Sequence, residues 1–208
     1  MSLCSRLFVC HYDRVMARAE AGVLGRWRRE ILGDLSGRVL ELGAGSGANL
    51  KYYPSSCEQL ALLEPNAAFR ELLQDRCRDA QRGGVQLIDA RAEALPFADQ
   101  SLDAVVATLV LCSVQHPITV LEECSRVLVP GGKLVVIEHV LSARGAIRWV
   151  QRLCDPFQKL FADGCSVTRD TRAGLEQAGF DCRAIQSGRM RPAPLHVRDC
   201  IYGAALKP

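Results

Sequence analysis

The stretch Val39-Leu40-Glu41-Leu42-Gly43-Ala44-Gly45-Ser46-Gly47 is followed, about 20 residues further on, by Leu62-Leu63-Glu64-Pro65. The first stretch begins as an apolar run rich in Leu, which predicts a buried parallel strand. The glycines after it predict a tight turn where the backbone can approach a ligand closely. Glu64 ends the next predicted strand, where its two carboxylate oxygens can accept hydrogen bonds from a ribose diol. The two segments together predict a nucleotide-binding unit.

Glu41 narrows the class of nucleotide. Gly43, Gly45 and Ala48 also satisfy the glycine pattern of dinucleotide-binding proteins. A carboxylate two residues before the first glycine would repel a pyrophosphate, but it suits a ligand that carries an ammonium and a sulfonium group. We therefore predict that the ligand is S-adenosylmethionine, with S-adenosylhomocysteine as the product.

Three later segments carry a family resemblance. They are Ala92-Glu93-Ala94-Leu95-Pro96-Phe97, residues 101–106, and residues 121–134 with Pro130-Gly131-Gly132. With the glycine turn, these segments make residues 39–140 resemble the class I S-adenosylmethionine-dependent methyltransferases of the type 11, small-molecule group. A closer likeness is to the methyltransferase-like alkyl-thiol methyltransferases and their bacterial relatives. It is carried by residues 108–114, 137–140, 163–165, 168–169 and 201–203.

The order of apolar runs predicts the fold class. Strand patterns alternate with amphipathic helical patterns, which is typical of an α/β, doubly wound, Rossmann-like sheet with helices on both faces. We expect seven mostly parallel strands in a single domain over residues 1–208, with a helical lid at 1–35, a cofactor-binding half at 36–140 and a substrate-side half at 141–208. The predicted strands are 38–42, 59–63, 85–89, 103–108, 133–139, 180–186 and 200–206. The predicted helices are 15–33, 47–52, 66–80, 117–128, 145–161 and 168–178.

Composition restricts the partners and the compartment. The net charge of +3, spread over 26 basic and 23 acidic residues, gives no reason to expect nucleic acid as a partner. The 10 cysteines form no C-x-x-C pair, which predicts reduced thiols and a cytoplasmic protein. No run has transmembrane length, and no obligate protein partner is evident. Arg26, Arg28 and Arg29 are expected on a solvated helix face, and weak peripheral membrane contact through residues 14–29 stays open.

The predicted cofactor residues follow the ligand's parts. Glu41 is expected to orient the ammonium group, Glu64 the ribose, and Ala92 with Glu93 the adenine, although Arg91 stands where the resembled family often carries Asp. Asn66 also suits the N-cap of the next helix. The full set is Glu41, Gly43, Ala44, Gly45, Gly47, Asn49, Glu64, Pro65, Asn66, Ala92, Glu93, Leu109 and Cys112. The change Glu64→Ala is expected to weaken cofactor binding by ~1.5–3 kcal/mol with little loss of folding.

Catalysis by a thiol methyltransferase would benefit from a base, because a free thiol is mostly protonated at neutral pH. The candidates are His139, at the end of a predicted strand, followed by His196 and Asp155. His11, Asp13 and Asp163 are weaker candidates. Cys112 is expected to be a small buried hydrophobe rather than a reactive thiol, and no metal is expected. The resembled thiol methyltransferases carry His where this chain has Cys200, which puts a thiol acceptor in doubt.

The function predicted from the sequence is methyl transfer to a small, largely apolar acceptor, with a thiol first. The alternatives are a quinone or phospholipid head-group methyltransferase, and a non-catalytic protein that binds S-adenosylmethionine. A dehydrogenase is excluded by Glu41, by the length of 208 residues and by Pro130-Gly131-Gly132. Trp149, Phe157 and Phe161 share one face of a predicted helix and are expected to pack in the core rather than to line a substrate pocket.

Overall fold

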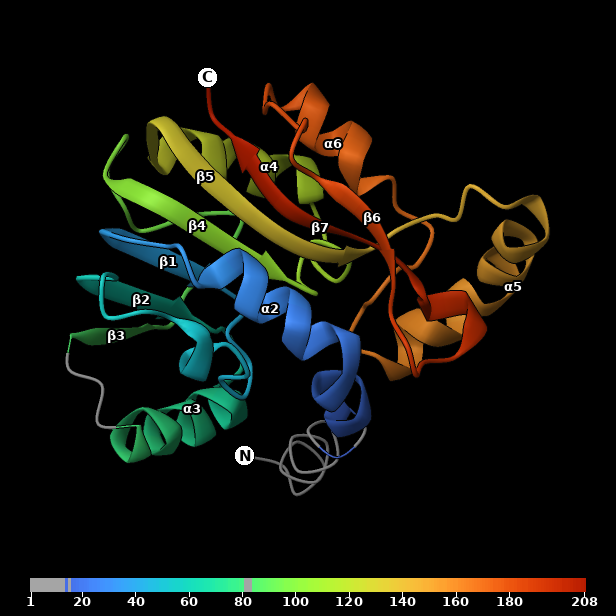
Figure 1. Cartoon of the computed structure of the whole chain (residues 1–208), viewed down its shortest axis with the longest axis horizontal. Helices are drawn as coiled ribbons and strands as arrows, with labels where there is room; N and C mark the ends of the chain where they lie inside the picture. The colour runs from blue at the N-terminus through green and yellow to red at the C-terminus, as the bar shows by residue number, and fades with distance from the viewer. Residues whose placement is uncertain (1–13, 15, 81–83) are drawn as a thin grey trace.

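A seven-stranded sheet forms the centre of the molecule (Figure 1). The computed structural model describes residue 14 and residues 16–80 and 84–208. The strand order is β3-β2-β1-β4-β5-β7-β6, with parallel pairing from β3 to β5 and β7 antiparallel to both of its neighbours. The strands are β1 Arg38–Leu42, β2 Gln59–Leu63, β3 Val85–Ile88, β4 Leu102–Thr108, β5 Leu128–His139, β6 Gln186–Arg189 and β7 Asp199–Leu206. This arrangement confirms the predicted α/β fold class.

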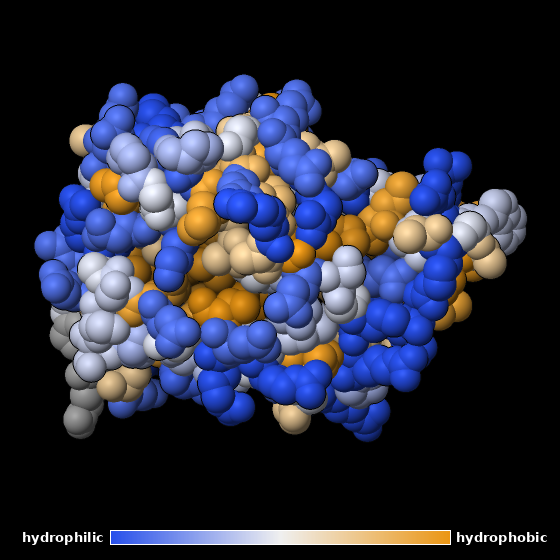
Figure 2. Space-filling model, turned by 45° about the horizontal axis from the view of Figure 1, so that its top comes forward, coloured by the Kyte–Doolittle hydropathy of each residue, from blue (hydrophilic) through white to orange (hydrophobic). Residues whose placement is uncertain are grey.

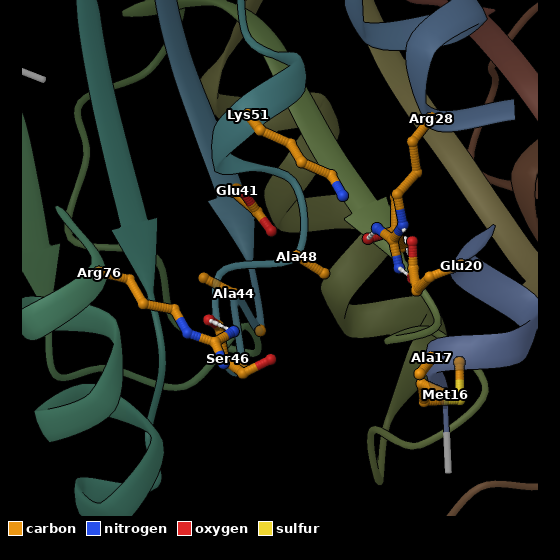
Figure 3. A pocket seen from close by; sticks show the side chains of 13 residues that line it. Met16, Ala17, Glu20, Arg28, Glu41, Ala44, Ser46, Ala48, Lys51 and Arg76 are labelled. Carbon is orange, nitrogen blue, oxygen red and sulfur yellow. Dashed lines mark hydrogen bonds and ion pairs between the residues drawn. The ribbon is translucent and has the colours of Figure 1, made fainter. Parts of the chain in front are cut away.

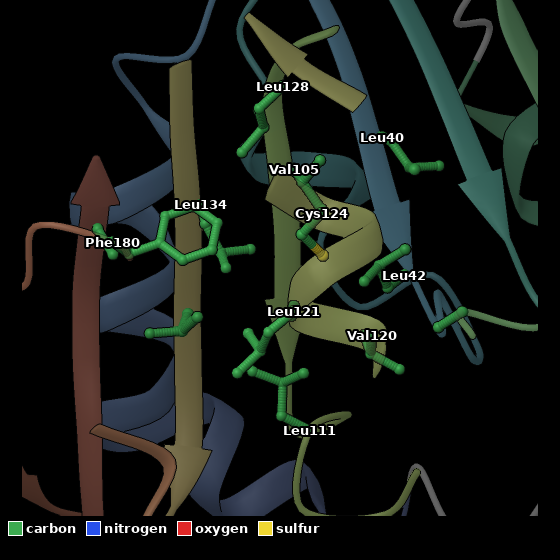
Figure 4. Close-up of a cluster of buried hydrophobic side chains, with 14 of the residues drawn as sticks. Leu40, Leu42, Val105, Leu111, Val120, Leu121, Cys124, Leu128, Leu134 and Phe180 are labelled. Carbon is green, nitrogen blue, oxygen red and sulfur yellow. The ribbon is translucent and has the colours of Figure 1, made fainter. Parts of the chain in front are cut away.

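Helices cover both faces of the sheet (Figure 1). They are η1 Glu20–Leu24, α2 Gly25–Leu32, α3 Ala67–Asp79, α4 Pro117–Val127, α5 Gly145–Phe161 and α6 Thr171–Gln177, with short 3-10 turns at η2 Leu50–Tyr52 and η3 Leu195–Val197. Side chains alternate along the central strands. Leu40 and Leu42 pack with α4 and α6, whereas Val39 packs with α2 and α3. The near-continuous apolar strands are therefore explained by burial on both faces, and Figure 4 shows the cluster beneath α4.

Several predicted boundaries are wrong. Strand 180–186 is displaced, because Asp181 makes only a single bridge to Leu206 and the sheet pairing of β6 begins at Gln186. The predicted helix 47–52 is only the 3-10 turn η2, because Gly47 has φ +82° and belongs to the glycine turn. Helix 168–178 begins at Thr171, since the side chain of Asp170 accepts a hydrogen bond from the Ala173 amide as its N-cap.

The predicted lid is only partly covered by the description. Residues 1–13, which include His11 and Asp13, lie outside the described residues. The predicted helix 15–33 is interrupted within its described residues, because Gly22 has φ −101° and ψ −127°. Beyond that break, Trp27 of α2 stacks on Tyr202 of β7 with ring centroids 4.5 Å apart. The helix is thereby attached to the antiparallel strand β7, next to the edge strand β6.

Helix α5 overturns the prediction for its aromatic face. Trp149 is 66% exposed, Phe157 65% and Phe161 74%, so these rings do not pack in the core. The two buried residues of α5 are polar, namely Gln151 and Asp155. Figure 1 shows α5 to one side of the sheet. In the space-filling view, apolar residues are visible on the surface at that end of the molecule (Figure 2).

Candidate functional site

A pocket opens at the carboxyl end of β1, between the glycine turn and the helical segment that contains Arg28 (Figure 3). Its position agrees with the rule that open α/β sheets bind ligands beyond the carboxyl ends of their strands. The lining residues are Met16, Ala17, Glu20, Arg28, Glu41, Gly43, Ala44, Gly45, Ser46, Ala48, Lys51, Arg76 and Thr108. The glycine turn and part of the predicted lid therefore face the same space.

The glycine turn is shaped by backbone that ordinary residues rarely adopt. Gly43, Gly45 and Gly47 have φ of +54°, +54° and +82°. A Cβ at Gly43 would lie 2.8 Å from a methyl of Val110, and one at Gly47 would lie 2.8 Å from Leu50 and Leu73. At Gly45 the nearest contact is 3.9 Å away, on the Gly43 carbonyl oxygen. Gly43 and Gly47 thus serve packing, while Gly45 leaves room at the pocket.

Glu41 is a buried carboxylate at the back of this pocket, 2% exposed. Its two oxygens accept hydrogen bonds from Tyr53 Oη at 2.7 Å and Asn49 Nδ2 at 2.9 Å. Burial raises the pKa of Glu41 to about 7, and the hydrogen bonds from Tyr53 and Asn49 and the charge of Arg28 oppose that rise. The carboxylate is therefore poised between its neutral and charged forms, and a cation beside it would favour the charged form.

Arg28 corrects one sequence expectation. Arg26 and Arg29 are exposed as predicted, but Arg28 is buried at 4% exposure. Its guanidinium donates to Asn49 Oδ1 at 2.5 Å and Thr108 Oγ1 at 2.9 Å, and it pairs with Glu20 at 3.0 Å. The sequence analysis did not assign Arg28 or Thr108 to the site, because nothing in a helix of mixed charge indicates that one of its arginines is buried.

The charges around the pocket fit S-adenosylmethionine. Its amino-acid end is zwitterionic, so it needs an anion for the ammonium group and a cation for the carboxylate. Glu41 provides the first, and Arg28 and Lys51 line the same pocket (Figure 3). Glu41 and Lys51 point into the space between β1 and the helix that carries Arg28 (Figure 3). A carboxylate alone, as the sequence analysis emphasised, would leave the cofactor's own carboxylate without a partner.

Glu64 lies beside the glycine turn, 5% exposed. Its Oε2 accepts a hydrogen bond from the Gly45 amide at 2.8 Å, and its Oε1 accepts one from the Asn66 amide at 2.8 Å. Each carboxylate oxygen has a second acceptor site, so the predicted ribose contact stays geometrically open. Asn66 caps α3 by accepting from the Ala68 amide, as predicted, while Pro65 is exposed between β2 and α3.

The predicted adenine residues lie outside the pocket lining. Ala92 is buried in the core cluster beneath α4, and Glu93 pairs with Arg91 at 3.4 Å. The arginine that replaces the expected Asp is therefore neutralised by its neighbour. The adenine contact through Ala92 and Glu93 remains a prediction.

A second buried carboxylate, Glu138, holds the loop that follows β4. It accepts hydrogen bonds from the amides of Val110 at 2.8 Å, Leu111 at 2.8 Å and Cys112 at 3.0 Å. Burial raises its pKa to about 7, against these three hydrogen bonds. Leu109 begins the loop at φ +61°, a strained conformation for a branched residue. Sequence reasoning missed Glu138, although an acid inside an apolar strand is the signal that revealed Glu41.

Three side chains with sulfur or nitrogen atoms that can bind a metal lie close together near the ends of β4 and β5. Cys112 Sγ lies 3.5 Å from Cys165 Sγ, and His139 Nδ1 lies 3.8 Å and 3.5 Å from these two sulfurs. All three residues are buried. Contact with Cys112 and then with His139 lowers the pKa of Cys165, whereas contact with Cys165 and burial raise the pKa of Cys112. Cys165 was not predicted as a site residue, because it is distant from the other two in sequence.

The remaining catalytic candidates, Asp155 and His196, are not among the three clustered donors. Asp155 Oδ1 accepts from Ser166 Oγ at 2.9 Å and from the Val167 amide at 2.8 Å, and its Oδ2 pairs with Lys159 at 2.7 Å. It therefore ties α5 to the segment before α6. His196 contacts Gln158 through Nε2 at 3.2 Å, and burial lowers its pKa. Of the three predicted catalytic residues, the structure brings only His139 to the ends of β4 and β5.

Comparisons with known proteins match this architecture. A family model described as a methyltransferase domain matches residues 40–136. Human thiol S-methyltransferase TMT1B is 42% identical over 195 residues, covering 86% of this chain and 78% of the relative. Demethylmenaquinone methyltransferase of Renibacterium salmoninarum is 34% identical over 143 residues, covering 67% and 58%. The crystal structure of a putative methyltransferase from Bacillus halodurans superposes with a TM-score of 0.72 at 16% identity, covering 89% of this chain and 98% of that one.

The fold and the sequence relationship lead to the same family. The fold superposes on that of the solved putative methyltransferase over 89% of this chain. The identity to thiol S-methyltransferase TMT1B extends over most of both chains. The chain therefore belongs to the class I S-adenosylmethionine-dependent methyltransferases, with S-adenosylmethionine as its cofactor.

Proposed function

We propose that this chain methylates the sulfur of a small, largely apolar thiol. The observation that carries the proposal is the 42% identity to human thiol S-methyltransferase TMT1B, which spans 86% of the chain. His139 supports it from the structure, because its buried ring lies at the ends of the strands, where an acceptor would meet the cofactor. An imidazole there can favour the thiolate form of an acceptor.

The chain's own residues prepare the reaction by positioning and by excluding water. Bound S-adenosylmethionine supplies an electrophilic methyl group on a sulfonium. Glu41 and Arg28 orient its amino-acid end, and Glu138 fixes the loop after β4. Arg169 covers that loop by donating to the carbonyl oxygens of Leu111 and Val114. The acceptor thiol must lose its proton before its sulfur attacks the methyl carbon in line, and a dry, aligned site supplies much of the rate enhancement.

The test is production of S-adenosylhomocysteine from purified protein with matched sets of thiols, quinones and phospholipids. Turnover with apolar thiols alone is expected. His139→Gln should lower kcat at least tenfold, by removing a group that acts on the acceptor. His116→Gln, at an exposed position, is the matched control and should leave kcat unchanged. Turnover with quinones or lipids but not with thiols would overturn the proposal.

A quinone acceptor is the second candidate, because a relative at 34% identity is named demethylmenaquinone methyltransferase. That relative matches a smaller part of the chain, 67% against 86% for TMT1B, so the thiol is preferred. Cofactor binding without turnover on any acceptor class would instead favour a non-catalytic S-adenosylmethionine-binding protein. The same assay therefore separates all three.

We also propose that α5 rests on an anionic lipid surface on the cytoplasmic side. Within the described residues, no helix is long and apolar enough to cross a membrane. The outer face of α5 nevertheless exposes large apolar side chains, whereas its polar Gln151 is held inside by hydrogen bonds to Val140, His196 and Ser142. The exposed apolar residues are Trp149, Leu153, Phe157, Leu160 and Phe161.

The charges on α5 support an anionic lipid surface as the partner of this face. Apart from the buried Asp155, the charged residues of the helix are Arg148, Arg152 and Lys159, all of them basic. An apolar stripe beside basic side chains is typical of helices that lie in the interface of anionic membranes. The earlier candidate for this role, residues 14–29, is weakened because Arg28 is buried.

Vesicle co-sedimentation tests this surface. Binding to phosphatidylserine-containing vesicles is expected, weaker with pure phosphatidylcholine and weaker at high salt. Phe157→Ser should reduce binding about tenfold or more, since burying one Phe contributes ~1.5–3 kcal/mol. Leu195→Ser, at an exposed apolar position outside α5, is the control. Vesicle binding that is weakened by Arg26→Gln and not by Phe157→Ser would overturn the assignment of the lipid-binding surface to α5. The cytoplasmic location is a separate point, and secretion of the chain in a disulfide-bonded form would contradict it.

A further inference from the structure

The cluster of Cys112, His139 and Cys165 joins three separate parts of the chain. Cys112 lies in the loop after β4, His139 ends β5, and Cys165 lies between α5 and α6. The three donor atoms lie within 4.8 Å of one another, and each residue is buried. The Ser166 amide also donates to the Cys112 carbonyl oxygen at 2.8 Å, so backbone contacts hold two of the three segments together beside the cluster.

The spacing of the donors is that of a tetrahedral metal site. Zinc binds sulfur at ~2.3 Å and imidazole nitrogen at ~2.0–2.1 Å, which places tetrahedral ligands ~3.8 Å apart for two sulfurs and ~3.5 Å apart for sulfur and nitrogen. The observed distances are 3.5 Å between the sulfurs, and 3.8 Å and 3.5 Å from His139 Nδ1 to Cys112 and Cys165. Shifts of a few tenths of an ångström would make all three ligands of one ion.

We propose that Cys112, His139 and Cys165 bind a zinc ion. Two thiolates and a neutral imidazole carry a charge that balances Zn²⁺, which favours a buried site because no net charge is placed in the interior. His139 then binds through Nδ1 and carries its proton on Nε2, and Nε2 has no hydrogen-bond partner among the described residues. Metal binding would release the thiol protons of Cys112 and Cys165 to solvent.

Cys200 bears on the number of ligands. It lies directly opposite His139 in the antiparallel pairing of β5 with β7, and it is buried. Its sulfur contacts the Val197 carbonyl oxygen at 3.9 Å and is not one of the three clustered donors. Three protein ligands with a fourth position left open is the pattern of catalytic rather than structural zinc sites. We therefore place Cys200 outside the ligand set.

The open position gives the metal a role in the reaction, a step that rests on the proposed thiol methylation. An acceptor thiol that binds the zinc ion loses its proton to solvent and becomes a thiolate. Its sulfur then forms a bond to the methyl carbon, while the bond from that carbon to the sulfonium breaks and its electron pair stays on the donor sulfur. In this arrangement His139 acts as a ligand rather than as a base.

Metal binding is measured first, without turnover. The reduced full-length protein, stripped with chelator, is titrated with Co²⁺, whose tetrahedral thiolate complexes show intense visible bands and sulfur-to-metal charge-transfer absorption. About one equivalent of Co²⁺ with these bands, displaced by Zn²⁺, is expected. Cys165→Ser and His139→Ala should each weaken binding at least tenfold. Cys182→Ser, at a buried cysteine elsewhere in the core, is the matched control and should bind as the wild type does.

Several results would overturn the site. Reduced wild-type protein that remains folded by circular dichroism and shows no Co²⁺ bands would do so. Unchanged affinity in folded Cys165→Ser would do so as well. Isolation of a Cys112–Cys165 disulfide that re-forms in the presence of excess Zn²⁺ would assign the pair to redox chemistry instead.

The role in the reaction is tested separately. Adding an apolar thiol should shift the charge-transfer bands of the Co²⁺ protein, and Cys200→Ser should leave them unchanged. Loss of Co²⁺ binding in Cys200→Ser would overturn the open fourth position. Tight Co²⁺ binding in a protein that methylates no thiol would refute the proposed function and leave the metal site standing.

Discussion

Glu41 shows how one buried side chain links the pH of the solution to cofactor binding. Its pKa is raised to about 7 by burial, so much of the carboxylate is neutral just below that pH. The ammonium group of the cofactor interacts favourably with the charged form only. We expect the affinity for S-adenosylmethionine to fall by a factor of about 5–10 between about pH 7.5 and about pH 6, as the charged fraction falls. Isothermal titration calorimetry over this range measures the effect.

The isosteric change Glu41→Gln is the control for that titration. Gln keeps an oxygen that can accept a hydrogen bond from Tyr53 or Asn49 but carries no charge at any pH. The variant should bind about tenfold or more weakly at pH 7.5, because a hydrogen bond to a charged group contributes ~1.5–3 kcal/mol. Its affinity should also vary little with pH. A variant that retains the pH dependence of the wild type would exclude Glu41 as its source.

The sequence analysis gave Glu64 only a role in ribose binding and expected Glu64→Ala to cost little stability, and the structure revises the second expectation. Glu64→Ala is still expected to weaken cofactor binding by ~1.5–3 kcal/mol. The structure adds a loss of stability, because the carboxylate accepts hydrogen bonds from the Gly45 and Asn66 amides. Leaving two amides unpaired should lower the free energy of unfolding by ~1–3 kcal/mol, measured by urea denaturation. Cofactor affinity equal to that of the wild type would remove Glu64 from the site.

At the scale of the element, the glycine turn offers a matched pair of substitutions. Gly43 and Gly45 share φ +54°, so alanine at either position has the same backbone strain of ~1–2 kcal/mol. Only Gly43→Ala also places its Cβ 2.8 Å from Val110. We expect Gly43→Ala to reduce the free energy of unfolding by ~1–3 kcal/mol more than Gly45→Ala does, by urea denaturation. Equal losses would show that Val110 can move aside.

Helix α5 shows the limit of amphipathic patterns at the same scale. The sequence correctly predicts residues 145–161 as a helix and correctly puts Trp149, Phe157 and Phe161 on one face. The spacing of the apolar residues does not determine which face of the helix packs against the rest of the protein. That choice is made by Gln151 and Asp155, whose hydrogen bonds to neighbouring segments hold the polar face against the body of the protein.

At the scale of the whole molecule, two buried carboxylates make stability depend on pH. Glu41 and Glu138 each have a pKa raised to about 7, above the ordinary value of 4.5. Between these values the folded state binds more protons than the unfolded state, so the free energy of unfolding falls as the pH rises. We expect a loss on the order of 1–3 kcal/mol per group between about pH 4.5 and about pH 7 in the cofactor-free protein.

The slope is checked by urea denaturation at a series of pH values. Glu138→Gln cannot ionise and should lose its share of the pH dependence. The variant should also be less stable at low pH, because a carboxamide cannot accept from all of the Val110, Leu111 and Cys112 amides as the carboxyl group does. A pH slope in Glu138→Gln equal to that of the wild type would contradict the proton-binding state of Glu138.

Several parts of the site are readable in the sequence for a simple reason. The glycine turn is local, so Gly43 and Gly47 predict its backbone without knowledge of the rest of the chain. Asn66 is likewise recognisable as a helix cap from the local sequence, because the amide that donates to its side chain belongs to Ala68, only two residues away. Arg28, by contrast, meets Thr108 across 80 positions in the sequence, and that contact depends on how α2 crosses the sheet.

The sequence by itself determined the α/β fold, the cofactor and the first segments of the site, because apolar periodicity and glycine placement act over short stretches of chain. The tertiary structure alone decided that Arg28 is buried, that the apolar face of α5 is exposed, and that Cys112, His139 and Cys165 meet. The physical reason is the same in each case. Burial and contact between distant segments depend on how strands and helices are stacked, and that stacking leaves no local pattern in the sequence.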